Sequence, residues 1–192
     1  AKLPTDMSET LALAALDVAG APAQTAKLVK PGDSVLILGA AGKSGMMCCY
    51  EAKKRVGPTG RVVGLVRNEK SKAKLLEMGI VDDVIIASAQ LPVEVLETSL
   101  AAKNGNEYDI SSNCVNVENT EMSSILPIRN GGTVYFFSMA TSFTKAALGA
   151  EGVGKDVDMI IGNGYTKGHA EITLQILRES EIVRTTFEKM YL

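Results

Sequence analysis

The stretch Val35-Leu36-Ile37-Leu38-Gly39-Ala40-Ala41-Gly42-Lys43-Ser44-Gly45 decides the fold, because it joins a continuous apolar run to a loop of small residues. Four consecutive aliphatic residues favour a strand buried on both faces, as the strands of a parallel sheet are. Turn residues at 30–33, Lys-Pro-Gly-Asp, come directly before this run. After Gly45 apolar residues recur at helical spacing as far as Val56, where Gly-Pro-Thr-Gly at 57–60 ends the helix. The stretch therefore predicts a strand, a glycine loop and a helix in that order.

The same alternation of strand and helix continues along the chain. Apolar runs predict five further strands, at 62–66, 84–86, 108–115, 133–138 and 157–161. Helical spacing predicts a lead-in at 8–30 broken at Gly20 and Pro22, helices at 69–79, 93–102 and 120–126, and a helical tail from Lys167. Residues 140–155 look irregular, and polar residues at 109–114 leave the register of the fourth strand open. Alternating elements imply right-handed crossovers, so we expect a doubly wound α/β fold with six parallel strands, the Rossmann fold, over residues 1–192.

Composition limits the classes of function. The 192 residues are 46% hydrophobic and 22% charged, with a net charge of -2, which argues against a nucleic-acid partner. The apolar runs are too short to cross a bilayer, and three cysteines make neither a disulfide framework nor a metal-ligand pattern. We therefore expect a cytoplasmic protein without a membrane or metal partner in this chain. Because the chain begins with Ala rather than Met, we also expect it to be a fragment cut at its N-terminal side.

The glycine loop is the candidate cofactor site. Its residues are Gly39, Ala40, Ala41, Gly42, Lys43, Ser44 and Gly45. A diphosphate approaches backbone N–H groups closely where Cβ atoms are absent, and the positive end of a helix dipole stabilises its charge. We assign the closest approach to Gly42, the exit from the strand to Gly39 and close helix packing to Gly45. The loop does not match G-x-G-x-x-G, because Ala40 stands where that pattern needs glycine, and it lacks the Walker spacing.

The end of the second strand leaves the choice between NAD and NADP open. NAD-binding folds place an acidic residue there to bind the adenosine ribose, but residues 61–68 contain no carboxylate. Arg67 could stack on the adenine or bind a 2′-phosphate, which would favour NADP. Alternatively Arg67 is solvated, and Asn68 or Glu69 holds the ribose. The cofactor expected from the sequence is NAD or NADP.

The nicotinamide is expected beyond the ends of the fourth and fifth strands, near the point where the strand order reverses. This places 115–117 and 138–140 near it, with Asn116, Ser138 and Met139 as candidate contacts. The sequence identifies no catalytic residue. His169, the one histidine, stands at the start of the last helical region and is interpreted as structural. Lys145 and Lys155 could bind a substrate carboxylate or be solvated.

The lead-in helix, the turn at 30–33, the glycine loop and the second strand resemble the cofactor domain of the medium-chain, zinc-alcohol-dehydrogenase-like superfamily. Stretches 39–62, 135–152 and 162–170 resemble an amino-acid dehydrogenase of lysine degradation within it. The resemblance implies oxidative deamination of an amino group to a ketone with release of ammonia, a homodimer formed by edge strand 157–161, and an N-terminal catalytic domain absent from this chain. The alternatives are an alcohol or quinone oxidoreductase and a nucleotide-sensing Rossmann module without catalysis.

Overall fold

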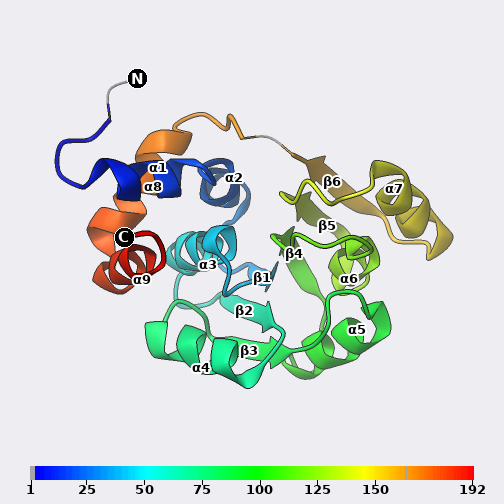
Figure 1. Cartoon of the computed structure of the whole chain (residues 1–192). Coiled ribbons are helices and arrows are strands. Elements are labelled where there is room, and N and C mark those ends of the chain that lie inside the picture. The colour runs from blue at the N-terminus through cyan, green and yellow to red at the C-terminus, as the bar shows by residue number, and fades with distance from the viewer. Residues whose placement is uncertain (1–2, 163) are drawn as a thin grey trace.

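Six parallel strands lie side by side in the order β3-β2-β1-β4-β5-β6 within the part of the chain that the structure describes (Figure 1). A computed structural model describes residues 3–162 and 164–192. The strands are β1 (Ser34–Leu38), β2 (Arg61–Val66), β3 (Asp83–Ile86), β4 (Tyr108–Asn113), β5 (Ile128–Phe136) and β6 (Val157–Ile161). The strand order reverses between β1 and β4, as in a Rossmann fold. The predicted doubly wound α/β fold is confirmed.

Helices cover both faces of this sheet (Figure 1). One face carries α1 (Glu9–Leu16), α2 (Gly20–Leu28), α3 (Lys43–Val56), α4 (Glu69–Met78), α8 (His169–Glu179) and α9 (Glu181–Tyr191). The other carries α5 (Pro92–Ala101), α6 (Glu121–Ile125) and α7 (Phe143–Gly152). All five side chains of β1 are buried, as its unbroken aliphatic run predicts. Successive side chains of β1 therefore enter the two cores in turn, Val35 and Ile37 on one face and Leu36 on the other.

The polar residues of β4 do not disturb its place in the sheet. Ile110 lies opposite Val35 of β1 and Asn113 opposite Leu38, in regular parallel register. The buried Ser111 hydroxyl donates a hydrogen bond to the Ser124 carbonyl (2.7 Å), so the strand buries polar groups that are satisfied. The register that the sequence left open is thus regular toward β1, and it shifts only toward β5, between Tyr108 and Ile110.

Three local expectations are wrong. The lead-in breaks at 17–19, and Gly20 and Pro22, the expected break, lie in the first turn of α2. Proline is tolerated there because the N–H that it lacks would have no intrahelical acceptor. The supposedly irregular segment 140–155 contains α7, which begins where the Ser142 hydroxyl accepts a hydrogen bond from the Lys145 N–H. β5 begins at Ile128 and runs through the glycine pair at 131–132, whereas the apolar run predicts a strand that begins only at 133.

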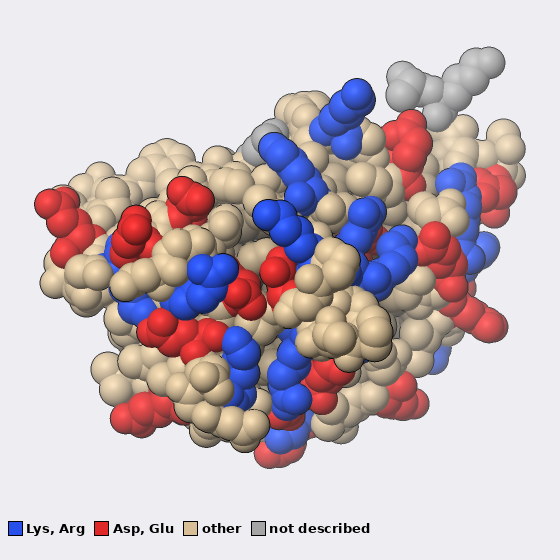
Figure 2. Space-filling model, turned by 180° about the vertical axis from the view of Figure 1, so that it is seen from behind, with Lys and Arg blue, Asp and Glu red and all other residues tan. Residues whose placement is uncertain are grey.

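The surface and the helix lengths are unexceptional. The face seen in Figure 2 carries basic and acidic side chains interspersed rather than one large field of a single sign. No helix within residues 3–162 and 164–192 is both long enough and apolar enough to cross a membrane. The cytoplasmic location stays a prediction.

Candidate functional site

A cavity of about 730 Å³ opens where the carboxyl ends of β1, β2, β3 and β4 meet. Parallel strands bring their carboxyl ends to one edge, and the cavity spans the reversal of strand order between β1 and β4, where Rossmann folds bind ligands. Eight of the residues predicted to bind cofactor line it: Gly39, Ala41, Gly42, Lys43, Ser44, Arg67, Asn68 and Asn116. The fold therefore brings together residues from three separate loops.

The amino end of α3 forms one wall of this cavity. Gly42 is the N-cap residue, and no side chain of the described residues caps the helix there. The Gly42 N–H donates to the Gly39 carbonyl (3.0 Å), and the Met46 N–H donates to the Gly42 carbonyl (2.9 Å). The N–H groups of the first helical turn, at 43–45, have no intrahelical acceptors. They are therefore donors for an anion at the positive end of the helix dipole.

The glycines of the loop are needed for different reasons. Gly39 adopts a φ of +76°, and a Cβ there would lie 3.1–3.2 Å from atoms of Cys114 and Val115. A Cβ on Gly45 would lie 2.2 Å from the Gly39 carbonyl oxygen, so the helix packs against the loop only without a side chain. A Cβ on Gly42 would meet only the Gly39 oxygen, at 3.3 Å, which leaves the cavity side of Gly42 open. Ala40 and Gly45 are buried behind the cavity wall, so they shape it without lining it.

Lys43 is held by two distant elements. Its ammonium forms an ion pair with Asp17, directly after α1, and lies 5.3 Å from the centre of the Tyr191 ring in α9. The lead-in and the C-terminal helix thus both fix the position of this lysine beside the glycine loop. Sequence reasoning missed this, because the three residues are far apart in the chain.

The end of β2 supplies one unpaired cation and one helix cap. Arg67 is exposed and makes no hydrogen bond or ion pair with any residue in 3–162 or 164–192. The Asn68 side chain accepts a hydrogen bond from the Ser71 N–H (2.9 Å) and so caps α4, which leaves its NH₂ group unused. No described residue that lines the cavity is acidic. The edge of the cavity at Arg67 is therefore positively charged.

The loop after β4 forms the opposite wall. The side-chain NH₂ of Asn113, buried at the end of β4, donates to the Thr120 and Ser124 hydroxyls (2.8 and 2.9 Å), and its side-chain oxygen Oδ1 accepts from the Val115 N–H (3.0 Å). This buried amide fixes the start of the loop, and Asn116 follows with an exposed side chain at the cavity. Asn116, expected near the nicotinamide, lines the cavity, and its contact with the cofactor stays a prediction. Sequence reasoning missed the role of Asn113.

Ser138 and Met139 do not line this cavity. The Ser138 hydroxyl accepts a hydrogen bond from the Ala140 N–H (3.2 Å) in a local turn, and the Met139 side chain is 92% exposed. Both follow β5, which lies one strand further from the switch point than β4. Their assignment as nicotinamide contacts stays a prediction.

Several lining residues were missed from the sequence. They are Val18, Ser71, Ser88, Ala89, Gln90 and Cys114. Ser88 to Gln90 follow β3, so the rule that parallel strand ends meet at one edge could have found them. The Gln90 amide donates to the Glu118 carbonyl (3.1 Å), which bridges the loops after β3 and β4. Val18, between α1 and α2, had no such signal.

The other candidate side chains lie away from the cavity. His169 Nδ1 is 3.1 Å from the Thr166 carbonyl, and its ring packs edge-on against Tyr165. Lys155 is not simply solvated, because it pairs with Glu107 and donates to the Ile128 carbonyl (2.7 Å). Lys145 donates to the Asn119 amide oxygen. Within the described residues there is no cluster of three His, Cys, Asp or Glu side chains that could hold a metal ion.

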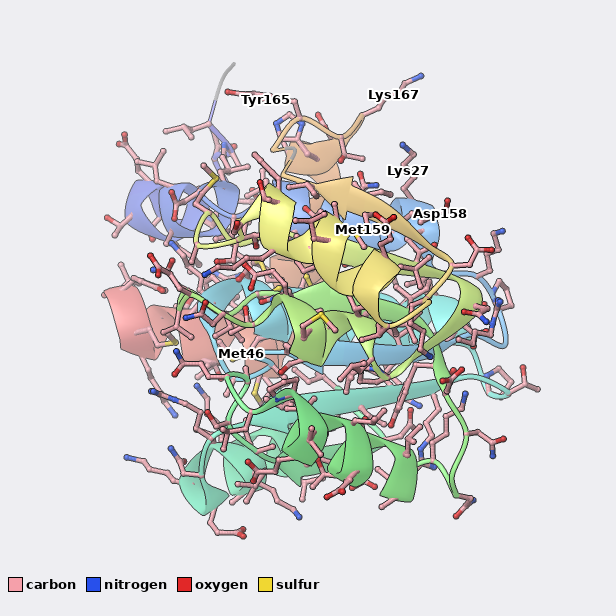
Figure 3. The ribbon with its side chains drawn as sticks, turned by 90° about the vertical axis from the view of Figure 1, so that its right-hand side faces the viewer. Lys27, Met46, Asp158, Met159, Tyr165 and Lys167 are labelled. Carbon is pink, nitrogen blue, oxygen red and sulfur yellow. The ribbon has the colours of Figure 1, made fainter. Side chains whose placement is uncertain are left out.

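A second, smaller hollow of about 420 Å³ lies beside α2 and the segment before α8. Figure 3 shows Lys27, Tyr165 and Lys167 on this side of the molecule, extending outward, while Met46 lies in the interior. Arg55, which also lines the hollow, already pairs with the buried Glu51. The hollow is lined by surface cations, and the buried Thr166 in its lining already donates a hydrogen bond to the Gln24 side chain (2.8 Å). We therefore take the cavity at the glycine loop as the candidate site.

Comparisons with known proteins give a consistent result. No protein-family model matches the chain. Over all 192 residues it is 99% identical to L-erythro-3,5-diaminohexanoate dehydrogenase of Acetoanaerobium sticklandii and 63% identical to the enzyme of that name from Fusobacterium nucleatum. In both cases it covers 56% of the relative's length. The chain thus spans about half the length of the curated relatives it matches.

Several solved structures with a similar fold are named as oxidoreductases, and another is complexed with NADPH. A mycobacterial protein complexed with NADPH superimposes with a TM-score of 0.71 at 18% identity, covering 96% of this chain and 62% of that one. The alcohol dehydrogenase of Thermus sp. ATN1 has a TM-score of 0.69 at 23% identity, covering 96% of this chain and 53% of that one. At these identities the likeness shows the fold alone. The chain is therefore similar along its whole length to two L-erythro-3,5-diaminohexanoate dehydrogenases, and its fold is the Rossmann-like fold found in alcohol dehydrogenases.

Proposed function

We propose that this chain is the nicotinamide-dinucleotide-binding part of an L-erythro-3,5-diaminohexanoate dehydrogenase. The observation that carries the proposal is the uncapped amino end of α3 at Gly42, which opens into the cavity at the switch point. The 99% identity to a dehydrogenase of that name supports the choice of reaction. The overall reaction would convert one amino group, with NAD(P)⁺ and water, into a ketone, ammonia, NAD(P)H and a proton, giving 5-amino-3-oxohexanoate or its isomeric keto acid.

The residues present fit a dinucleotide. The N–H groups at 43–45 would bind the diphosphate, and the open side of Gly42 gives its oxygens room to approach the backbone. The cavity extends from Arg67 and Asn68 on one side to Asn116 on the other, so an adenosine and a nicotinamide riboside would lie on opposite sides of the helix end. The nicotinamide, when bound, supplies the hydride acceptor.

This chain contributes binding and orientation. Its one histidine is outside the cavity, and the cavity holds no carboxylate among the described residues. We therefore propose that a separate catalytic domain supplies the general base for the amine. In the amino-acid dehydrogenase proposed here, the walls formed by α3 and the loop after β4 position the nucleotide and exclude water from its buried side.

Calorimetry on the full-length protein tests the binding site. We expect NAD⁺ or NADP⁺ to bind, and Gly42→Val to weaken binding by about tenfold or more because the added side chain fills the space left for the diphosphate. Gly152→Val is the matched control, since a Cβ at Gly152 meets nothing within 4 Å and Gly152 is outside the cavity. No binding of any oxidised or reduced nicotinamide nucleotide to folded protein would refute the proposal.

Absorbance at 340 nm with L-erythro-3,5-diaminohexanoate tests the reaction. We expect reduction of the nucleotide and release of ammonia. Reduction with an alcohol or a quinone partner but not with this amine would make the protein a different oxidoreductase. Nucleotide binding without reduction by any of these substrates would instead indicate a sensing module.

The choice between NAD and NADP depends on Arg67. Its guanidinium has no partner among the described residues, and the amide of Asn68 has a free NH₂ group. If Arg67 binds a 2′-phosphate, Arg67→Ala should lower the affinity for NADP⁺ and leave that for NAD⁺ nearly unchanged. Lys70→Ala is the control, because Lys70 is an exposed neighbour outside the cavity. Equal affinity of wild type and Arg67→Ala for NADP⁺ would assign the ribose to Asn68 or Glu69.

A further inference from the structure

Two cysteines meet at the inner wall of the nucleotide cavity. The Sγ atoms of Cys48, in α3, and Cys114, directly after β4, are 3.9 Å apart. Cys48 is fully buried, whereas Cys114 is half-buried and lines the cavity. The pair therefore has one thiol that a small reagent can reach from the cavity and one that lies behind it.

The backbone around this pair is closely packed. The Cys114 N–H continues the β1–β4 ladder by donating to the Leu38 carbonyl (3.0 Å), and a Cβ on Gly39 would lie only 3.2 Å from the Cys114 backbone. Cys48 lies on the buried side of α3, within the hydrophobic core. The two thiols are thus held in contact by the same elements that form the two walls of the cavity.

We propose that Cys114 is a thiol-modification site inside the nucleotide cavity, that a low-molecular-weight disulfide oxidises it, and that Cys48 resolves the product as an intramolecular disulfide. Shielding of Cys114 by bound nucleotide is the second part of the inference, and only this part rests on the proposed function.

The chemistry balances in two exchange steps. The Cys114 thiolate attacks one sulfur of the reagent RSSR, which forms a Cys114–SR mixed disulfide and releases RS⁻. The Cys48 thiolate then attacks the Sγ of Cys114 and releases the second RS⁻, and the two protons lost by the cysteines convert both products to RSH. Two protein thiols are oxidised and one RSSR is reduced to two RSH.

The order of the two steps follows from exposure. The neighbouring Cys114 thiol and burial both raise the pKa of Cys48, so Cys48 is a poor first nucleophile. Cys48 is fully buried and does not line the cavity, whereas Cys114 does, so a reagent in the cavity meets Cys114 first. Cys49, the adjacent cysteine, is also fully buried, and burial raises its pKa. It forms no sulfur contact with Cys114 like that of Cys48.

Peptide mapping of the full-length protein after treatment with 2-hydroxyethyl disulfide tests the first part. We expect a Cys48–Cys114 disulfide in the wild type, a stable Cys114 mixed disulfide in Cys48→Ala, and an unchanged Cys48–Cys114 bond in the matched control Cys49→Ala. The disulfide map of the wild-type protein is informative even if one of the variants fails to fold. An unmodified Cys114, or a bond from Cys114 to Cys49, would overturn the proposal.

Repeating the reaction with nucleotide present tests the second part. At ten times the dissociation constant measured by calorimetry, about one molecule in eleven is free, so modification of Cys114 should slow roughly tenfold. An unchanged rate despite measured binding would overturn the shielding while leaving the proposed function intact. Absence of binding in calorimetry would refute the proposed function and with it the shielding, and the disulfide map would still decide the thiol site.

Discussion

At the scale of single residues, the site depends on glycines, which have no side chain, as much as on residues that have one. Gly45 lies inside α3, where glycine is a poor helix former, yet an added Cβ would lie 2.2 Å from a carbonyl oxygen of the loop. The steric cost outweighs the gain in helix propensity. The loop and the first turn of α3 can therefore approach closely only because residue 45 is glycine.

Gly45→Ala tests this balance. Alanine would gain about 1 kcal/mol in helix propensity, but overpacking against the backbone costs about 1–3 kcal/mol, so we expect a net loss of stability and weaker nucleotide binding. Urea unfolding measures the first and calorimetry the second. Gly152→Ala, where a Cβ meets nothing within 4 Å, should leave both unchanged or raise stability slightly. A Gly45→Ala protein as stable as the wild type would contradict the packing argument.

Asp109 gives a prediction about pH. Burial alone would raise the pKa of this carboxyl group, but hydrogen bonds from Ser34 and Arg129 outweigh burial, and the pKa lies below its ordinary value of 3.8. A lowered pKa in the folded state stabilises the fold above pH 3.8, and this contribution is lost as pH falls through the folded-state pKa.

Unfolding of wild type and Asp109→Asn at several pH values measures this contribution. The wild type should exceed the variant in unfolding free energy at pH 6, and the difference should shrink between about pH 4 and pH 2. Asp158→Asn, an exposed carboxyl of β6, serves as the control and should show no such convergence. A difference that stays constant over this range would show that Asp109 acts by shape rather than by charge.

At the scale of elements, the loop after β4 is positioned by a buried polar network rather than by apolar packing. The Asn113 amide joins Thr120, Ser124 and the N–H of Val115. The sequence here looked irregular for a strand because these polar residues serve the connection to α6 as well as the sheet. Side-chain hydrogen bonds of this kind depend on residues that the turn brings back, so strand patterning does not reveal them.

Asn113→Ala should therefore destabilise the protein by about 1–3 kcal/mol, because it leaves buried donors and acceptors without partners. It should also weaken nucleotide binding by releasing the loop at 115–117. Urea unfolding and calorimetry measure the two effects. Ser112→Ala is the matched control in the same strand, since the Ser112 hydroxyl makes no hydrogen bond with the described residues. Equal losses of stability and of nucleotide affinity in both variants would show that Asn113 has no special role.

At the scale of the whole molecule, the strand order leaves β3 and β6 at the two edges of the sheet. Figure 3 shows Asp158 and Met159 on β6. The Gly162 N–H donates to Phe136 in β5, so by alternation the N–H groups of Asp158 and Ile160 face β5 and that of Met159 faces the open edge. An edge with unpaired backbone groups can pair with another strand. We propose that β6 joins two copies of the protein in a homodimer.

Light scattering of the full-length protein tests this. We expect a dimer for the wild type and a monomer for Met159→Pro, which removes the outward N–H but no bond to β5. Asp158→Ala, a side-chain change that keeps every backbone donor, should remain a dimer, and thermal melting confirms that each variant is folded. A wild-type monomer, or a dimer that survives Met159→Pro, would exclude pairing through β6.

The order of elements and the glycine loop were predictable from the sequence because they depend on local patterns. The aliphatic run of β1, the turn residues before it and the glycines after it act over a few residues, and they place the strand, the loop and α3 within two or three residues of their observed ends. The extent of β5 was misjudged, since two consecutive glycines are typical of a turn. In the structure Ile128 and Gly132, on either side of Gly131, pair with β4 and β6.

Local pattern thus determined that this chain is a doubly wound α/β protein with a loop suited to a diphosphate. Only the tertiary structure decided which side chains share the cavity: it pairs Lys43 with Asp17, sets Cys114 against Cys48 and leaves Ser138 and Met139 outside. Contacts between distant segments arise when the sheet and helices pack as layers, and the spacing of residues along the sequence does not predict them.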